Sequence, residues 1–75
     1  MTIHFSADFG HIMPYHGEIV VQQIDKLTLP LVWAEFKRKC KEEWRLNNKD
    51  CKKIEVYYHE NNEEIILKKV ENENN

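Results

Sequence analysis

Four histidines and two cysteines are the side chains of this sequence best suited to binding metal ions or acting as nucleophiles. His11 and His16 lie five residues apart, Cys40 falls inside a predicted helix, and no Cys-x-x-Cys or His-x-x-x-His pair occurs. Structural zinc sites need four converging ligands, which usually come in closely spaced pairs. We therefore expect no bound metal and no cofactor, with His4 and His59 at solvated strand positions.

The acidic residues do not form a pattern typical of catalysis either. Glu60, Glu63 and Glu64 cluster in a polar segment typical of a solvated turn, whereas acid–base catalysis needs carboxylates that converge in a cleft. The sequence has no glycine-rich phosphate loop and no nucleophile elbow. Cys40 lies on the apolar side of the predicted helix, where a cysteine usually serves as a small core residue. We expect a protein that is not an enzyme.

Charge is distributed unevenly along the chain, which has 75 residues and a net charge of −2. Residues 1–25 hold three acids and no lysine or arginine; residues 26–53 hold nine basic residues and four acids. Residues 54–75 hold two lysines and six acids, so the chain has a basic middle and an acidic end. The candidate contact residues on the basic side of the predicted helix are Lys37, Arg38, Lys41 and Arg45.

Three interpretations of this basic helix face stay open. A solvated surface is the usual role of such a run of charges, an acidic protein partner is the second interpretation, and nucleic-acid phosphates are the third. The acidic overall balance disfavours strong electrostatic binding to nucleic acid.

The helix itself is predicted over residues 29–46. Its apolar residues recur at three- and four-residue steps and so share one side of a helix: Val32, Trp33, Phe36, Cys40 and Trp44. We expect this side to be core, Thr28 to be the N-cap, and Asn47-Asn48 to end the helix.

Four strands are predicted around the helix, over residues 2–9, 18–25, 53–59 and 64–70. The order of elements indicates an α+β fold, β-β-α-β-β, with a mixed or antiparallel four-stranded sheet and one helix packed on one face. Residues 1–70 would form a single small domain and residues 71–75 a disordered polar tail. The loop over residues 10–17 is unusually apolar, and its Ile12, Met13 and Tyr15 either contact a partner or cover the edge of the core.

The first ten residues, MTIHFSADFG, have no basic segment and no apolar run, so we expect no signal peptide. No stretch approaches the length of a membrane span, and two cysteines are too few for a disulfide-rich secreted scaffold. These features predict a cytoplasmic protein with no membrane partner and reduced thiols.

Residues 28–67 carry a family resemblance. The Trp33-Ala34-Glu35-Phe36 helix start, the strand KIEVYY over residues 53–58 and the acidic segment HENNEE before Ile65-Ile66 are similar to the Phox/Bem-type interaction domain of the ubiquitin-like β-grasp class. In that family an acidic cluster on one copy pairs with a basic cluster on another. The resemblance implies that Glu60, Glu63 and Glu64 form the acidic side.

These observations lead to one functional expectation and two alternatives. We expect a non-enzymatic protein–protein interaction module that uses the basic helix face, the acidic hairpin and the apolar loop, with another protein or another copy of the chain as partner. The first alternative is a small inhibitor, of a virus or phage type, that docks on a host protein. The second is a weak nucleic-acid binder.

Overall fold

The elements follow one another in the predicted order. The structure, a computed structural model, describes residues 1–72. Its strands and helix are β1 (Thr2–Asp8), β2 (Tyr15–Val20), α1 (Thr28–Lys39), β3 (Lys53–Glu60) and β4 (Glu63–Glu71). A π-helical turn (Cys40–Trp44) continues α1, and a short 3₁₀ turn (Asn48–Asp50) precedes β3. The α+β fold with four strands and one helix is thereby confirmed.

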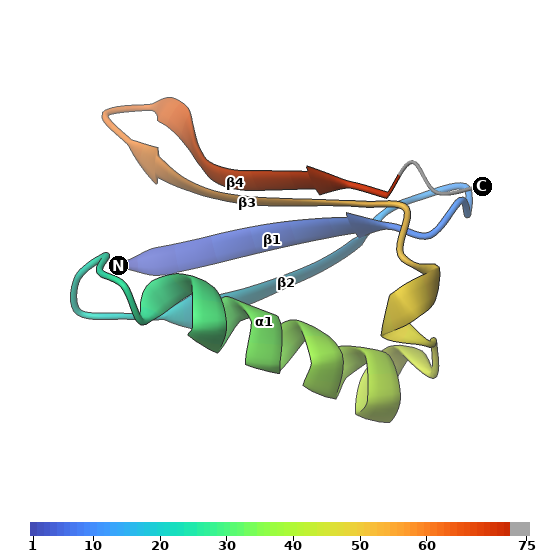
Figure 1. Cartoon of the computed structure of the whole chain (residues 1–75). Coiled ribbons are helices and arrows are strands. Elements are labelled where there is room, and N and C mark those ends of the chain that lie inside the picture. Colours follow the sequence, from blue (N-terminus) through green and yellow to red (C-terminus); the bar gives the residue numbers. More distant parts are fainter. Residues whose placement is uncertain (73–75) are drawn as a thin grey trace.

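The four strands form one antiparallel sheet in the order β2-β1-β3-β4. Both β2 and β3 run antiparallel to β1, so they are parallel to each other, and α1 lies in the crossover that joins them. Figure 1 shows α1 along one face of the sheet, on the side of β1 and β2. Of the two predicted arrangements, a mixed or an antiparallel sheet, the structure has the antiparallel one.

The core lies between α1 and the inner face of the sheet, and period-two alternation selects its strand residues. Inward positions of β1 and β3 are buried, as are three helix positions one turn apart, and these residues are Ile3, Phe5, Ala7, Ile54, Val56, Val32, Phe36 and Cys40. In both strands the buried residues are therefore the apolar members of the alternating pattern.

Gly17 is required by the packing of Phe5. Phe5 is fully buried and lies opposite Gly17 in the β1–β2 register. A Cβ atom built on Gly17 would lie 2.3 Å from Cζ of the Phe5 ring. The absence of a side chain on β2 therefore lets the Phe5 ring fill the space below this strand.

The π-helical turn brings Trp44 into the aromatic part of the core. In a regular α-helix, residues eight positions apart are offset by roughly 80° about the axis, which would turn Trp44 away from Phe36. A π turn holds more residues and reduces this offset. The centroid of the Trp44 ring accordingly lies 6.2 Å from that of Phe36 and 6.4 Å from that of Phe5.

The predicted helix ends were both wrong. At the C-terminal end, Arg45 adopts the left-handed conformation (φ 58°) and donates its backbone N–H to the Cys40 carbonyl, so the helical segment stops before Asn47. At the N-terminal end, Thr28 already belongs to α1, and its hydroxyl accepts the Asp25 backbone N–H. Thr28 is therefore not the N-cap; it stabilises the turn that leads into the helix.

Pairing with β1 sets the limits of β2. This strand begins at Tyr15 and ends at Val20, whereas the prediction placed it over residues 18–25. Ala7 pairs with Tyr15 and Thr2 pairs with Val20, so the length of β1 determines which residues of the next segment become strand. Sequence periodicity within residues 15–25 cannot supply this constraint.

Strand β4 extends one residue beyond its predicted end at residue 70. Strand β4 includes Glu71, and the Asn72 backbone N–H donates to the Lys52 carbonyl at 2.7 Å. The rest of the predicted tail, residues 73–75, lies outside the described residues.

The prediction that Trp33 lies in the core was also wrong, because 43% of its surface is exposed. Helix α1 packs mainly on β2 and β1, so a residue on its β3-facing side lies at the border of the core. Trp33 contacts the Phe36 ring at a centroid distance of 4.9 Å and lines a hollow together with Ile54 and Val70.

We predict that Gly17→Ala lowers the free energy of unfolding by about 1–3 kcal/mol, because the new methyl group overlaps the Phe5 ring. Chemical denaturation followed by tryptophan fluorescence measures this change. His16→Ala, in the exposed neighbouring position, is the matched control and should change the free energy by no more than about 0.5 kcal/mol. Equal stability of the two variants would contradict the assigned role of Gly17.

Candidate functional site

The apolar loop divides into two parts with different environments. Ile12 is fully exposed and Met13 is 71% exposed. Tyr15 instead belongs to β2, where its ring packs against Phe9 and, at a centroid distance of 5.1 Å, against Trp44. Tyr15 therefore covers the edge of the core, while Ile12 and Met13 are exposed to solvent.

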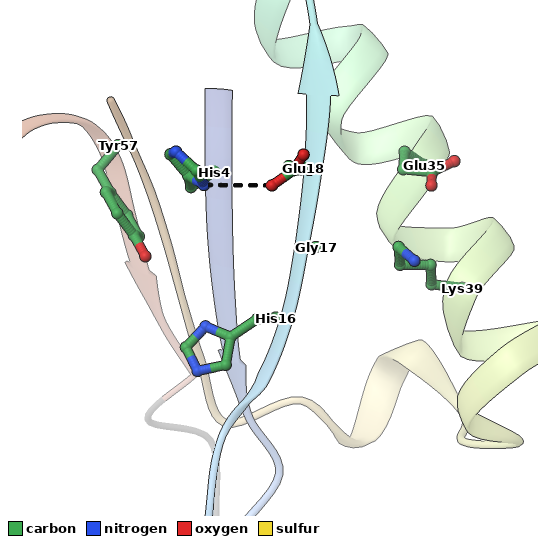
Figure 2. A pocket seen from close by; sticks show the side chains of 7 residues that line it. All are labelled: His4, His16, Gly17, Glu18, Glu35, Lys39 and Tyr57. Carbon is green, nitrogen blue, oxygen red and sulfur yellow. Dashed lines mark ion pairs between the residues drawn. The ribbon is translucent and has the colours of Figure 1, made fainter. Parts of the chain in front are cut away.

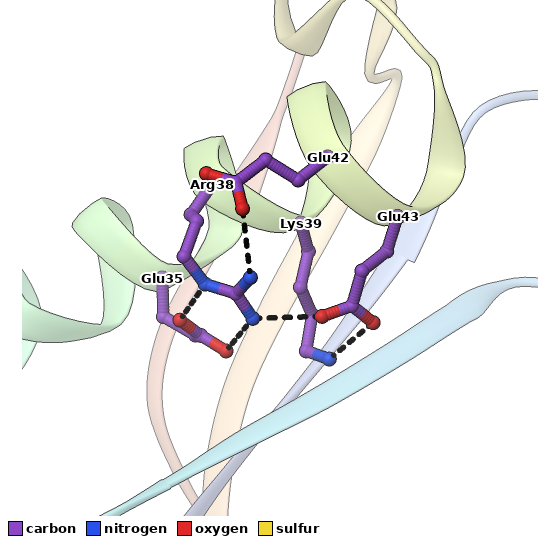
Figure 3. A network of polar contacts seen from close by, with 5 residues as sticks. All are labelled: Glu35, Arg38, Lys39, Glu42 and Glu43. Atoms are coloured by element: carbon purple, nitrogen blue, oxygen red, sulfur yellow. Dashed lines mark hydrogen bonds and ion pairs between the residues drawn. The ribbon is translucent and has the colours of Figure 1, made fainter.

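The basic helix residues also fall into two groups. Lys37, Lys41 and Arg45 are exposed, and no ion pair joins them to another residue within 1–72. Arg38 is surrounded by acids (Figure 3): its guanidinium lies 2.8 Å from Glu35, 3.5 Å from Glu42 and 2.7 Å from Glu43. Its charge is thus balanced within the chain.

This network has clear electrostatic consequences. Hydrogen bonds from Arg38 lower the pKa of the Glu35 and Glu43 carboxyl groups, and the same bonds raise the pKa of Arg38. Lys39 adds a further contact, 3.0 Å from Glu43. The exposed side of α1 is therefore a mixed-charge surface along its middle and is basic only at scattered positions.

The acidic residues flank the turn between β3 and β4. Glu60 is the last residue of β3 and Glu63 the first of β4, and Glu64 follows it. Asn61 and Asn62 form the turn with φ values of 53° and 67°, the left-handed conformation that asparagine tolerates best among non-glycine residues. All three glutamates are exposed at the tip of a long hairpin.

The acidic hairpin tip lies at one end of the molecule, and the apolar loop and the C-terminal end of the helical segment lie at the other end (Figure 1). The tip lies at the end of the sheet where β1 begins, because β3 runs antiparallel to β1. The contact between Tyr15 and Trp44 joins the apolar loop to the end of the helical segment, next to Arg45. In a molecule that measures 35 × 23 × 20 Å, the apolar loop and the C-terminal end of the basic helical segment share one end of the long axis.

A ring cluster on the open face of the sheet was missed by the sequence analysis. His4 stacks on Tyr57 at a centroid distance of 5.4 Å, and His59 contacts both rings at 5.5 and 5.6 Å. Glu18 lies 3.7 Å from His4 Nδ1 (Figure 2). Alternation in each strand places these residues on one face, but only the β1–β3 register shows that they are neighbours.

Neither the histidines nor the cysteines form a reactive centre in the described part of the chain. Residues 1–72 contain no group of His, Cys, Asp and Glu side chains arranged to hold a metal ion. Both cysteines are free thiols. Burial raises the pKa of Cys40 to about 11 and also raises that of Cys51, so both thiols stay protonated and poorly nucleophilic near neutral pH.

Comparison of the chain with models of protein families, with curated proteins and with solved structures gave no match. Within residues 1–72, no helix is both long enough and apolar enough to cross a membrane.

We predict that Arg38→Met raises the pKa of Glu35, because the variant removes the two hydrogen bonds that favour the charged carboxylate. Carboxyl chemical shifts followed by NMR as a function of pH measure the change. In the native chain the lowered pKa values of Glu35 and Glu43 stabilise the fold above the ordinary value of 4.5, and this stabilisation is lost as the pH falls through the lowered values.

Lys37→Met is the matched control for this titration, since it removes the same charge from a neighbouring helix position without an ion pair. It should leave the Glu35 titration unchanged. An identical effect of both variants would show that net charge, and not the contact with Arg38, lowers the Glu35 pKa.

Proposed function

We propose that this chain is a non-enzymatic protein–protein interaction module that associates head to tail. The acidic hairpin tip of one molecule meets the other end of a second molecule, where the apolar loop and the exposed basic residues of the helical segment lie. The observation that supports this proposal is that three exposed glutamates lie at one end of an elongated domain, while Lys41 and Arg45, which make no ion pair within residues 1–72, lie toward the other end.

The separation of charges suits a directional contact. Glu60, Glu63 and Glu64 project from a hairpin tip, and the other end carries Lys41 and Arg45 without ion pairs to described residues. Opposite charges on distinct surfaces steer association and fix orientation, while apolar side chains at the contact supply affinity. Ile12 and Met13 are exposed at the basic end and can supply that apolar contact.

The same arrangement follows the pairing that the resemblance to the Phox/Bem-type domain implies, with the three glutamates as the acidic side. A protein partner suits the helix surface better than nucleic acid, because Glu35, Glu42 and Glu43 lie among its cations and would repel phosphates. The two free thiols fit the expected cytoplasmic location, where thiols stay reduced.

A pair of complementary charge variants tests the proposal. The tip variant is Glu63→Lys with Glu64→Lys, and the helix variant is Lys41→Glu with Arg45→Glu. A head-to-tail contact leaves free ends, so the mass of the native chain should keep growing with concentration at low salt. Each variant alone should lose this growth through like-charge repulsion. In an equimolar mixture, the reversed tip meets the reversed helix end, and the native tip of the helix variant meets the native helix end of the tip variant, so the growth of mass should return. Analytical ultracentrifugation measures all three.

Lys68→Glu with Lys69→Glu is the matched control, because it changes the net charge by the same amount as the helix variant and lies in the hairpin but away from its tip. It should leave the growth of mass intact. The proposal fails if the native mass does not grow with concentration at low salt, or if the mixture associates no further than either variant alone.

A second candidate function is a small inhibitor-type protein that docks on another protein through the exposed loop residues. Full exposure of Ile12 beside Met13 supports it, since a large apolar side chain on a loop is a typical interface anchor.

For this second candidate, we predict that Ile12→Ala with Met13→Ala weakens binding to a captured partner by roughly tenfold or more without changing stability. Pull-down followed by calorimetry on the identified partner measures the loss. Ile66→Ala, an exposed apolar residue on β4, is the control and should bind normally. Unchanged binding by the loop variant excludes the loop as the docking surface.

A further inference from the structure

The two edges of the sheet differ in how well they are protected against pairing with another strand. Edge strand β4 has an irregular register beside Val56 and Tyr57 and carries Lys68 and Lys69. Bulges and lysines are common protective features of edge strands. Edge strand β2, YHGEIV, pairs with β1 without a register shift and has neither lysine nor proline. Strand β2 is therefore the unprotected edge.

The backbone of β2 offers a regular set of hydrogen-bonding groups at this edge. Val21 and Met1 exchange hydrogen bonds in both directions, each 2.9 Å long. Because alternate residues of an antiparallel strand bond the same neighbour, residues 15, 17, 19 and 21 bond β1. The N–H and C=O groups of His16, Glu18 and Val20 consequently point away from β1, toward the free edge.

Apolar residues flank this edge on both faces of the sheet. Val20 is 75% exposed and shares the open face with Glu18, whereas Leu31, 52% exposed, lies on the helix side. Both line a hollow with Ile19 and Ala34, to which Glu35 and Arg38 also contribute. A neighbouring hollow shares Val20 and Leu31 and continues to Leu27. In the other direction, a third hollow includes Gly17, and Figure 2 shows this residue between His4 and Tyr57 on one side and Glu35 and Lys39 of the helix on the other. The free edge of β2 thus runs beside a furrow along α1.

We propose that a second copy of this chain occupies the edge, with the two β2 strands paired antiparallel about a two-fold axis at Gly17. The outward-pointing residues must bond one another, which restricts the pairing to a few registers. One of them places Glu18 against Glu18, a repulsive arrangement. The register centred on Gly17 places His16 opposite Glu18 twice, so that an imidazole N–H can donate to each carboxylate.

This pairing would complete a continuous eight-stranded sheet across two chains. The axis is perpendicular to the sheet, so both helices lie on the same face, and the helix residues nearest to the axis are Glu35 and Lys39, which line a hollow with Gly17. At the axis, the two Gly17 residues face each other as a pair without mutual hydrogen bonds. The Cα atoms of such a pair lie close together, which suits residues without side chains. The surface differs from that of the proposed head-to-tail contact, and a two-fold contact stops at two chains.

Amide hydrogen exchange measured by NMR at increasing protein concentration tests the pairing directly. Exchange at His16, Glu18 and Val20 should slow as a dimer forms, whereas exchange at Ile66, on the free edge of β4, should not change. The tip variant should behave in the same way, which separates this proposal from the head-to-tail contact. A chain that remains monomeric and unprotected at these amides overturns the proposal and leaves the edge to a strand of another protein.

A charge exchange tests the register. Glu18→Lys should weaken dimerisation about tenfold or more, because lysine then faces His16 in both pairs and the favourable contacts are lost. His16→Glu combined with Glu18→Lys restores opposite charges in this register and should recover dimerisation. Failure of the double variant to recover it, while it remains folded by NMR, would overturn the assigned register.

Discussion

The contact between Phe5 and Phe36 is the interaction on which the rest of the domain depends. Both side chains are fully buried, and their rings meet edge to face with centroids 6.2 Å apart. Phe5 stands at the centre of β1, and Phe36 stands at the middle of the helical segment, so this contact fixes the distance between the two layers. Two other features accommodate this contact. Gly17, opposite Phe5, leaves room for the Phe5 ring, and the π turn brings the Trp44 ring next to it.

A single helix about 10 Å wide cannot cover four strands spaced about 4.8 Å apart. Helix α1 packs on β1 and β2, and the inner face of the β3–β4 hairpin is left with partial cover from Trp33. A domain of this size also has a small core, so a larger fraction of its apolar surface stays exposed than in a larger domain. This explains why exposed apolar residues occur along the helix and on both edge strands.

Local patterns in the sequence were sufficient for the class of fold but not for the assembly of its surfaces. Alternation of Ile3, Phe5 and Ala7, and of Ile54 and Val56, identified the inner faces because each strand carries its own period. The limits of β2 could not be predicted, since they depend on pairing with β1. The ring cluster of His4, Tyr57 and His59 could not be predicted either, because strand pairing also decides which residues are neighbours. These residues come from β1 and β3, which are distant in sequence and adjacent only in the sheet.

For the candidate contact residues too, the sequence revealed the types of residue but not their arrangement in space. The charges at 37–45 and 60–64 were evident, but their positions at opposite ends of the domain depend on strand direction. The pairing of Arg38 with three glutamates could be foreseen only in part. Glu35 and Glu42 lie three and four residues away, the usual helical spacing, whereas Glu43 is five residues away and lies within the π turn.

The π turn has a further consequence for how this chain can vary. A turn closed by a bond from Arg45 to Cys40 holds one residue more than an α-helical turn. The helical segment can therefore be regarded as an ordinary helix lengthened by a single residue near its end. The extra length is absorbed within one turn, so the segments on either side keep their positions relative to the sheet. Related chains that differ in length by one residue at this point could thus keep the same core.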